Sequence, residues 1–253
     1  MGRIYAIANQ KGGVAKTTTA VNLGAYLAEL GKKVLLIDID PQGNASSGLD
    51  VDRANLEYCI YDVLVNEVII NKVIQPTSVD DIYILPATLQ LAGAEVELAN
   101  AISREIILKS SIKSIVGSYD YILIDCPPSL GLLTLNALTA ADGVIIPIQC
   151  EYYALEGLGQ LISTIDLIKR HLNSQLTVRG IVLTMFDGRT NLAIQVVDEI
   201  KKHFKDRVYR SIIPRNVRLS EAPSHGKPVM VYDHRSRGAE AYHELAKEVM
   251  GIE

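Results

Sequence analysis

Short apolar runs alternate with amphipathic helical stretches along most of the chain. The runs are rich in Val, Ile and Leu without interruption, a pattern typical of parallel strands that are covered on both faces. Alternating strands and helices predict an α/β fold, a single doubly wound and mostly parallel sheet with helices on both faces. Such a sheet binds its ligand at the carboxyl ends of the strands. The expected strands are residues 4–8, 33–39, 82–86, 121–125, 144–148 and 178–185, and the expected helices are residues 17–30, 91–116, 132–140, 155–172, 192–204 and 239–250.

Composition fits this fold and narrows the class of protein. The chain has 253 residues, 48% of them hydrophobic and 21% charged, which is typical of a globular protein with a sizeable core. It carries no repeat, low-complexity tract or linker, so we expect one domain over residues 1–253. No apolar run approaches the ~20 residues that span a bilayer, and the N-terminus lacks the layout of a signal peptide. We therefore expect a cytoplasmic protein without membrane attachment.

The segment KGGVAKTT at residues 11–18 lies between the first expected strand and the first expected helix. A strand, a glycine turn, a lysine, a hydroxyl and a helix together form the loop that surrounds the phosphates of a nucleotide. Backbone N–H groups point at the phosphates, and the helix N-terminus adds positive potential. Lys16 supplies a full charge to the β- and γ-phosphates, and the hydroxyl of Thr17 can bind Mg²⁺.

The loop departs from the usual phosphate-binding pattern at two positions. Lys11 precedes the glycines, and Ala15 stands where this loop normally has glycine. If that position needs a positive φ, alanine costs on the order of 1 kcal/mol. The backbone N–H of Ala15 is still available to a phosphate, so the site should keep its function.

Two aspartates follow buried strands and are candidates for chemistry. Asp40 leaves the second expected strand into a Pro/Gly loop, where its carboxylate could orient or deprotonate a water that attacks the γ-phosphate. Asp125 ends an apolar strand and precedes two prolines, which fits a carboxylate that binds Mg²⁺ directly or through water. The structural alternatives are that Asp38 and Asp40 cap the next turn, and that Asp125 only begins a turn.

Cysteines and histidines show no metal-binding spacing. Cys59, Cys126 and Cys150 are expected to be ordinary small core residues, and the five histidines are scattered.

Charge is distributed unevenly along the chain. The net charge is −4, but residues 187–237 carry eleven Lys or Arg against six acids, which makes this segment +5 and the remainder −9. That asymmetry permits a basic face on an acidic protein, as nucleic-acid binding requires.

Three segments resemble the deviant Walker-A ATPases of the ParA/MinD group: the early-lysine loop, LLIDIDPQGN and YILIDCPPSLGLLTLNAL. Two later segments, QCEYYALEG at residues 149–157 and IPRNVRLSEAPSHGKP at residues 213–228, are similar to the chromosomal ParA/Soj proteins within that group. The resemblance covers residues 3–250, which is nearly the whole chain.

The resemblance implies roles for individual residues. Lys11 matches the signature lysine, which reaches the phosphates of the partner in a nucleotide-sandwich dimer. Asp40 matches the residue that positions the attacking water. The other implied positions are the phosphate loop at Gly12, Gly13, Val14, Ala15, Lys16, Thr17 and Thr18, the Mg²⁺ site at Thr17 and Asp125, the adenine site at Pro214 and Asn216, and the DNA contacts at Arg189 and Arg218.

These roles imply an ATP-dependent switch. ATP and Mg²⁺ would join two subunits, the homodimer would bind nucleoid DNA without sequence preference, and slow hydrolysis, accelerated by a ParB-type partner, would release it during chromosome or plasmid segregation. One alternative is a MinD-like ATPase that positions other cargo, although the C-terminal segment AYHELAKEVMGIE lacks a basic membrane-binding face. Others are a metabolic enzyme with the same core, and a nucleotide-gated binding module with little turnover because of Ala15. Either arginine could also be an ordinary surface position or half of a weak ion pair.

Overall fold

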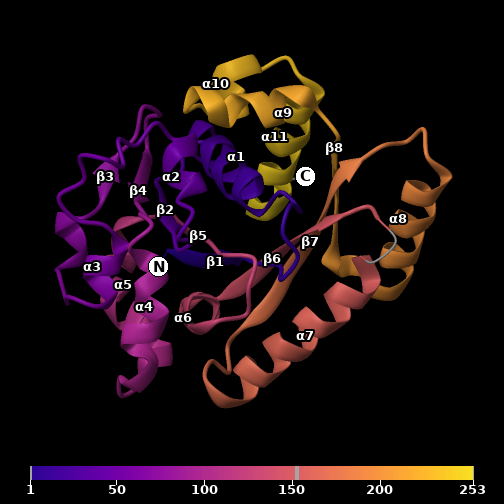
Figure 1. Ribbon diagram of the computed structural model, residues 1–253. Coiled ribbons are helices and arrows are strands. Elements are labelled where there is room, and N and C mark those ends of the chain that lie inside the picture. Colours follow the sequence, from indigo (N-terminus) through magenta and orange to yellow (C-terminus); the bar gives the residue numbers. More distant parts are fainter. Residues whose placement is uncertain (1, 152–153, 253) are drawn as a thin grey trace.

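The structure is a computed structural model that describes residues 2–151 and 154–252 (Figure 1). Tyr152 and Tyr153, which belong to one of the segments with family resemblance, lie outside the described residues. The strands are β1 Arg3–Ile7, β2 Val34–Asp38, β3 Gln75–Pro76, β4 Ile82–Leu85, β5 Tyr121–Asp125, β6 Gly143–Gln149, β7 Thr177–Phe186 and β8 Val208–Pro214. The helices are α1 Lys16–Glu29, α2 Asn44–Gly48, α3 Ile60–Leu64, α4 Leu91–Glu97, α5 Ile107–Ile112, α6 Leu132–Ala140, α7 Ala154–His171, α8 Asn191–Phe204, α9 Val217–Glu221, α10 Val229–Asp233 and α11 Arg237–Met250.

The strands form one sheet in the order β3-β4-β2-β5-β1-β6-β7-β8. Every neighbouring pair is parallel except β3 and β4, which confirms the predicted doubly wound, mostly parallel sheet. Asp125 at the end of β5 lies in register with Ile7 of β1 and with Asp38 of β2. The carboxyl ends of these three strands are therefore level, and the loops that follow them meet at one edge of the sheet.

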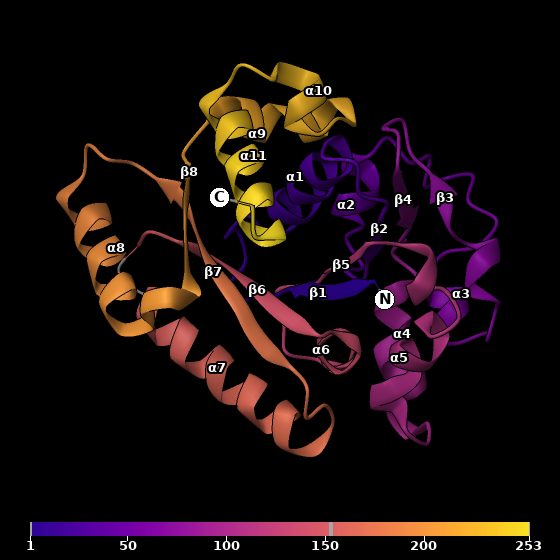
Figure 2. The ribbon, with the colours of Figure 1, turned by 180° about the vertical axis from the view of Figure 1, so that it is seen from behind.

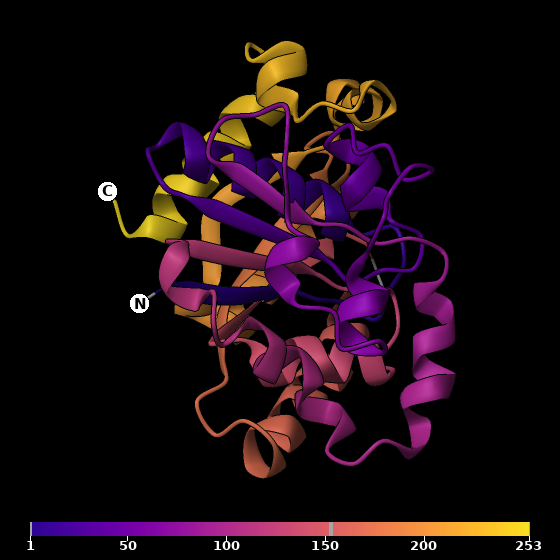
Figure 3. The ribbon, with the colours of Figure 1, turned by 90° about the vertical axis from the view of Figure 1, so that its left-hand side faces the viewer.

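Helices cover both faces of the sheet, so each face has its own core (Figures 1 and 3). On β1, Tyr5 and Ile7 pack with residues of α1 and α11, whereas Ile4 and Ala6 pack on the opposite face with residues of α4 to α8. Successive side chains of a strand point to opposite faces, which is why an unbroken apolar run serves both cores. The view from behind shows α8 beside α7 at the β8 edge (Figure 2).

Helix α1 carries the phosphate loop at its N-terminus and is buried along most of its length, from Thr19 to Ala28. It packs against α11, where the hydroxyls of Thr19 and Tyr242 lie 3.1 Å apart. The helix ends where Gly31 takes a φ of 77°, a left-handed conformation that glycine adopts without steric cost. The helix that holds the phosphates is thus fixed by the sheet below it and by the last helix of the chain.

The prediction of one helix over residues 91–116 is wrong. The segment breaks into α4, short 3₁₀ turns at Leu98–Asn100 and Arg104–Ile106, and α5. Ala101 is extended, and Ser103 has a φ of 55°, a left-handed conformation that interrupts a right-handed helix. The apolar spacing continues across the break because both pieces pack on the same face of the sheet, so the pattern alone did not reveal it. Strands β3 and β8 and the five-residue helices were not predicted.

Candidate functional site

The phosphate loop follows β1 and is held in place by its neighbours in the sheet. The amide of Asn9 donates to the carbonyl oxygen of Pro147 on β6 at 2.8 Å, and its Oδ1 accepts from the backbone N–H of Lys11 at 3.0 Å. On the other side, the hydroxyl of Thr184 on β7 donates to the carbonyl oxygen of Val14 at 3.2 Å. Asn9 and Thr184 are both buried, and both bind main-chain atoms: Asn9 binds those of Lys11 and Pro147, and Thr184 binds that of Val14. The loop is therefore shaped before any nucleotide arrives.

Ala15 adopts a left-handed backbone conformation, with φ 67° and ψ 34°, directly before the first residue of α1. This is the conformation for which glycine is preferred at this position, and alanine holds it at a cost of about 1 kcal/mol or more. Gly13 also has a positive φ, 72°, so the loop turns twice through conformations that favour glycine. The loop keeps its shape despite the additional methyl group.

Lys16 lies at the start of α1 and is buried, with 7% of its surface exposed. Its Nζ atom donates to the carbonyl oxygen of Lys11 at 3.1 Å, so the side chain folds back across the loop. Burial lowers the pKa of the Lys16 ammonium, while the nearby carboxylates of Asp125 and Asp40 act in the opposite direction. A buried ammonium at the centre of this loop can neutralise phosphate charge in a region that excludes water.

Asp125 lies at the end of β5 beside this lysine. Both of its carboxylate oxygens are buried, and neither has a hydrogen-bond partner within the described residues. Burial, and secondarily the negative charge of Asp38, raise the pKa of Asp125 well above its usual range, whereas the hydroxyl of Thr17 and the charge of Lys16 oppose this shift. Burying a carboxylate without a partner destabilises the fold unless a cation or a hydrogen-bond donor binds its oxygens. This environment fits Mg²⁺, which takes few protein oxygens and fills its other positions with water and phosphate.

Asp38 and Asp40, at the end of β2, have different surroundings. Asp38 is fully buried and accepts bonds from the backbone N–H and the hydroxyl of Ser46, at 2.8 and 2.7 Å. Burial raises the pKa of Asp38 to about 6. These bonds anchor the start of α2, so the capping interpretation describes Asp38.

Asp40 lies two residues after Asp38, in the loop that follows β2. Its Oδ1 accepts from the backbone N–H of Gln42 at 2.9 Å, which also makes it part of a turn. That bond engages one of the two carboxylate oxygens. Asp40 contributes negative charge at Lys16 and at Asp125, so it lies at the phosphate side of the loop. Capping and catalysis are therefore compatible for this residue.

The predicted adenine residues line a cavity of about 470 Å³ beside the loop. Pro214 ends β8 and Asn216 follows it, and both face the same cavity as Ala15 and Thr18. Tyr242 of α11 also lines it. A nucleotide whose phosphates lie on the loop can therefore place its base between the ends of β7 and β8.

Lys11 has a partner that the sequence did not suggest. Its Nζ atom lies 3.2 Å from Oε2 of Glu151, which follows β6, and both side chains are partly exposed. Gln10 reaches the same region, since its amide donates to Oε1 of Gln160 on α7 at 2.7 Å. The signature lysine is thus held on the surface of its own chain. Nothing in the spacing of the motifs signalled Glu151, or the buried Thr184 that supports the loop.

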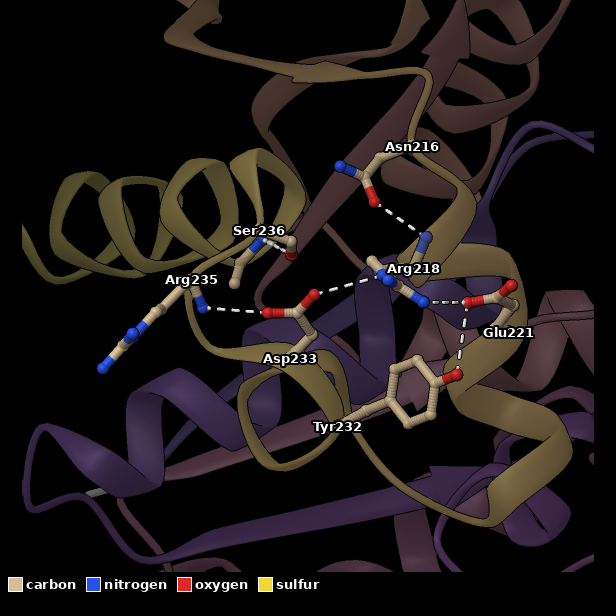
Figure 4. Close-up of polar contacts among 8 residues, drawn as sticks. Asn216, Arg218, Glu221, Tyr232, Asp233, Arg235 and Ser236 are labelled. Atoms are coloured by element: carbon tan, nitrogen blue, oxygen red, sulfur yellow. Dashed lines mark hydrogen bonds and ion pairs between the residues drawn. The ribbon is translucent and has the colours of Figure 1, made fainter.

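Arg189 and Arg218 lie at the same edge of the sheet, after β7 and β8, and both have carboxylate partners. Arg189 binds Asp187 through Nε at 2.8 Å and through Nη2 at 2.6 Å. Arg218 binds Glu221 through Nη1 at 2.9 Å and Asp233 through Nε at 3.2 Å (Figure 4). Acids of the same segment therefore pair with both arginines, and the other cations of the segment are spread over α8, β8, the start of α11 and the turns between them.

The remaining sequence predictions concern metals and membranes. Cys59, Cys126 and Cys150 are free thiols buried in the core, as expected. No cluster of three or more His, Cys, Asp or Glu in residues 2–151 and 154–252 has the arrangement of a metal site. Within the same ranges, no helix has the length and apolar character needed to cross a bilayer.

Comparisons with known proteins agree with this geometry. The family model described as "AAA domain" matches residues 2–178. The sporulation initiation inhibitor protein Soj of Bacillus subtilis is 63% identical over 98% of this chain and 98% of its own length. The chromosome partitioning protein ParA of Myxococcus xanthus is 56% identical over 99% of this chain and 88% of its own length.

Solved structures share the whole fold. A cobyrinic acid a,c-diamide synthase from Mycobacterium smegmatis with bound ADP and magnesium superimposes with a TM-score of 0.86 at 39% identity, covering 99% of this chain and 94% of that one. The cell division ATPase MinD of Pyrococcus furiosus gives a TM-score of 0.82 at 29% identity, covering 99% of both chains.

Proposed function

The chain belongs to the ParA/Soj family of chromosome-partitioning ATPases, and on that premise we propose that it is a dimeric, ATP-dependent switch that binds DNA without sequence preference. Slow hydrolysis of ATP, accelerated by a ParB-type partner, then releases the DNA and drives chromosome or plasmid segregation. One observation supports the proposal most. Lys11, Lys16, Asp40, Asp125 and the base-sized cavity all lie at the carboxyl edge of one sheet.

ATP and Mg²⁺ are the cofactors of this enzyme, as in the ADP–magnesium complex of the mycobacterial structure. Backbone N–H groups of residues 12–18 and the ammonium of Lys16 bind the phosphates. Thr17 and Asp125 hold the metal, Asp125 directly or through water, because its buried oxygens are unpaired among the described residues. When bound, Mg²⁺ neutralises the charge that develops on the phosphates during hydrolysis. Pro214 and Asn216 hold the adenine in the cavity beside Thr18.

Asp40 orients the attacking water in this proposal. Its carboxylate follows β2 at the same edge as Asp125, and its turn bond to Gln42 fixes the direction of the side chain. Phosphoryl transfer depends mainly on positioning and charge stabilisation, so a fixed carboxylate near the γ-phosphate is sufficient for slow turnover.

Lys11 joins two subunits. In the single chain it pairs with Glu151 at the protein surface, where an ion pair contributes about 0–1 kcal/mol. The phosphates of a nucleotide bound to a second chain offer a stronger partner, because a phosphate carries more charge than a carboxylate. Exchange of Glu151 for these phosphates makes dimerisation depend on ATP. The proposed location of the dimer on the nucleoid follows from DNA contacts by Arg189 and Arg218.

Sedimentation of the protein with ATP, ADP or no nucleotide, each with and without DNA, tests the proposal. We expect a dimer with ATP only, and much tighter binding to DNA in that state than with ADP or without nucleotide, with the affinity decreasing steeply as salt is raised. Binding to anionic vesicles in place of DNA would support the MinD-like alternative. ATP-dependent DNA binding without any release of phosphate would support a binding module with little turnover.

A further inference from the structure

Arg218 is held between two carboxylates that come from different helices. Its Nη1 atom lies 2.9 Å from Oε2 of Glu221 on α9, and its Nε atom lies 3.2 Å from Oδ2 of Asp233 on α10. The hydroxyl of Tyr232 donates to the same Glu221 oxygen at 3.2 Å. Figure 4 shows these four side chains converging, with the guanidinium between the two acids. The arginine proposed to contact DNA therefore already has two anionic partners.

These contacts compete directly with DNA. A guanidinium binds carboxylate and phosphate oxygens through the same N–H groups. The side chain of Arg218 is 51% exposed, so solvent screens each ion pair and each contributes little to stability. Arg218 can exchange these weak ion pairs for contacts with DNA phosphates. The free energy lost with each broken ion pair is then subtracted from the free energy of DNA binding.

The helix that carries this arginine is also a wall of the nucleotide cavity. Asn216 caps α9, since its Oδ1 accepts from the backbone N–H of Arg218 at 2.8 Å. Asn216, Leu219 and Ser220 line the cavity proposed for adenine. A base in the cavity would therefore contact the five-residue helix that positions both Arg218 and Glu221. Asp233 lies on α10, outside that helix.

The second arginine has the same kind of partner. Arg189 is bound by Asp187, two residues earlier, through two of its nitrogen atoms. Both of the arginines proposed for DNA binding thus have carboxylate partners, and in both cases the acid belongs to the segment with a charge of +5.

We propose that Glu221 and Asp233 form a carboxylate clamp that competes with DNA for Arg218, and that a base in the cavity weakens the clamp through its contact with α9. The proposal rests on the proposed function, because it assumes that Arg218 contacts DNA. DNA binding then depends on two things: on dimerisation, and on release of Arg218 within each subunit. The clamp weakens DNA binding by Arg218 until nucleotide is bound. Breaking its ion pairs lowers the stability of the fold only slightly, because they are exposed to solvent.

Asp233→Asn tests the clamp. Asparagine keeps an oxygen that can accept from the backbone N–H of Arg235, as Asp233 does at 3.2 Å, so the turn should be preserved while the charge is lost. DNA affinity is measured for this variant with ATP and without nucleotide, in the native background and in an Arg218→Ala background. Glu240→Gln is the matched control, since Glu240 is an exposed acid in the first turn of α11, close in sequence to the clamp and outside it. A urea unfolding curve for each variant checks that it is folded.

We expect Asp233→Asn to tighten DNA binding of the nucleotide-free protein about two- to fivefold, the size of one surface ion pair. The gain should be smaller with ATP and should disappear in the Arg218→Ala background. The Glu240→Gln control should change affinity equally in both backgrounds. An equal gain from Asp233→Asn with and without Arg218, or with and without ATP, overturns the clamp. If Arg218→Ala alone leaves DNA binding with ATP unchanged, then the DNA contact in the proposed function is itself wrong.

Discussion

The Nζ atom of Lys11 lies 3.2 Å from Oε2 of Glu151, within the same chain. The two side chains are 41% and 48% exposed, so the pair contributes about 0–1 kcal/mol and can be exchanged for another anion. The main chain at Lys11 is fixed independently of this pair by the bond from its N–H to Asn9. The side chain can therefore change partner without a change in the loop.

Lys11→Ala should abolish ATP-dependent dimers while leaving ATP binding by the monomer within about threefold, because Lys16 and the loop N–H groups remain. Sedimentation and nucleotide-binding titration measure the two properties. Glu151→Gln is the matched variant: it removes the competing charge and should dimerise at equal or lower protein concentration. Dimers of normal stability in Lys11→Ala would refute the role of Lys11 across the interface.

Asp40→Asn should lower ATP turnover by at least about 100-fold while ATP-dependent dimers persist, since positioning of the nucleophile is lost but the binding groups are intact. Asparagine keeps an oxygen acceptor for the N–H of Gln42, and Asp40→Ala removes it as well. Phosphate release and sedimentation are measured on both variants. Loss of ATP binding in Asp40→Asn would show that the residue supports the loop rather than the water.

Asp125→Asn should raise the stability of the nucleotide-free protein and weaken its response to Mg²⁺ and ATP. Asp125 is buried, has no hydrogen-bond partner of normal distance and angle within the described residues, and lies close to Asp38; these effects outweigh the nearby Thr17 hydroxyl and Lys16 charge, so the ionised carboxylate is destabilising. With Mg²⁺ and ATP the same carboxylate becomes a ligand, and binding then stabilises the folded state. Thermal unfolding with and without Mg²⁺–ATP measures both effects, with EDTA as the control. A decrease in the stability of the free protein would contradict this account.

Ala15→Gly should raise the free energy of unfolding by up to about 1 kcal/mol, because glycine adopts the φ of 67° without a steric cost but gains entropy in the unfolded chain. Urea unfolding measures the change. ATP affinity should be unchanged, since the backbone N–H is kept. A large increase in turnover would instead show that the methyl group limits the kinetics of the native protein.

Replacement of Arg189 and Arg218 by glutamate should abolish DNA retention and leave nucleotide binding intact. Each arginine lost from a phosphate contact reduces the slope of log affinity against log salt by about 1. Lys113→Glu is the control, because Lys113 is an exposed cation after α5, away from β7 and β8. If the control weakens DNA binding as much as the arginine replacements, net charge rather than a local contact is responsible.

Much of the site was predictable from the sequence because its residues follow buried parallel strands. The apolar runs before Asp40 and Asp125 predicted β2 and β5, and parallel strands bring their carboxyl ends together. The loop motif then indicated which side chains face the phosphates. The break at Ser103 was not predictable in this way, since both halves of the segment keep the same apolar face.

The partners of the predicted residues could not be found from motifs. Glu151 pairs with Lys11 from 140 positions away, and Thr184 supports Val14 across 170 positions. Such contacts depend on the strand order, in which β6 and β7 follow β1, and the sequence pattern does not determine that order. The acids beside Arg189 and Arg218 are visible in the sequence, but the fold decides which of them face the guanidinium groups.

The position of β1 in the middle of the sheet has a consequence for synthesis on the ribosome. Its neighbours are β5 and β6, and the helix that follows it is covered by α11, at the other end of the described chain. Residues 9–19 leave the ribosome well before their supports Pro147, Thr184 and Tyr242 are made. The phosphate loop and its helix therefore cannot acquire all of these supporting contacts until β6, β7 and α11 have left the ribosome, so a nascent chain holds this loop less firmly than the folded protein does.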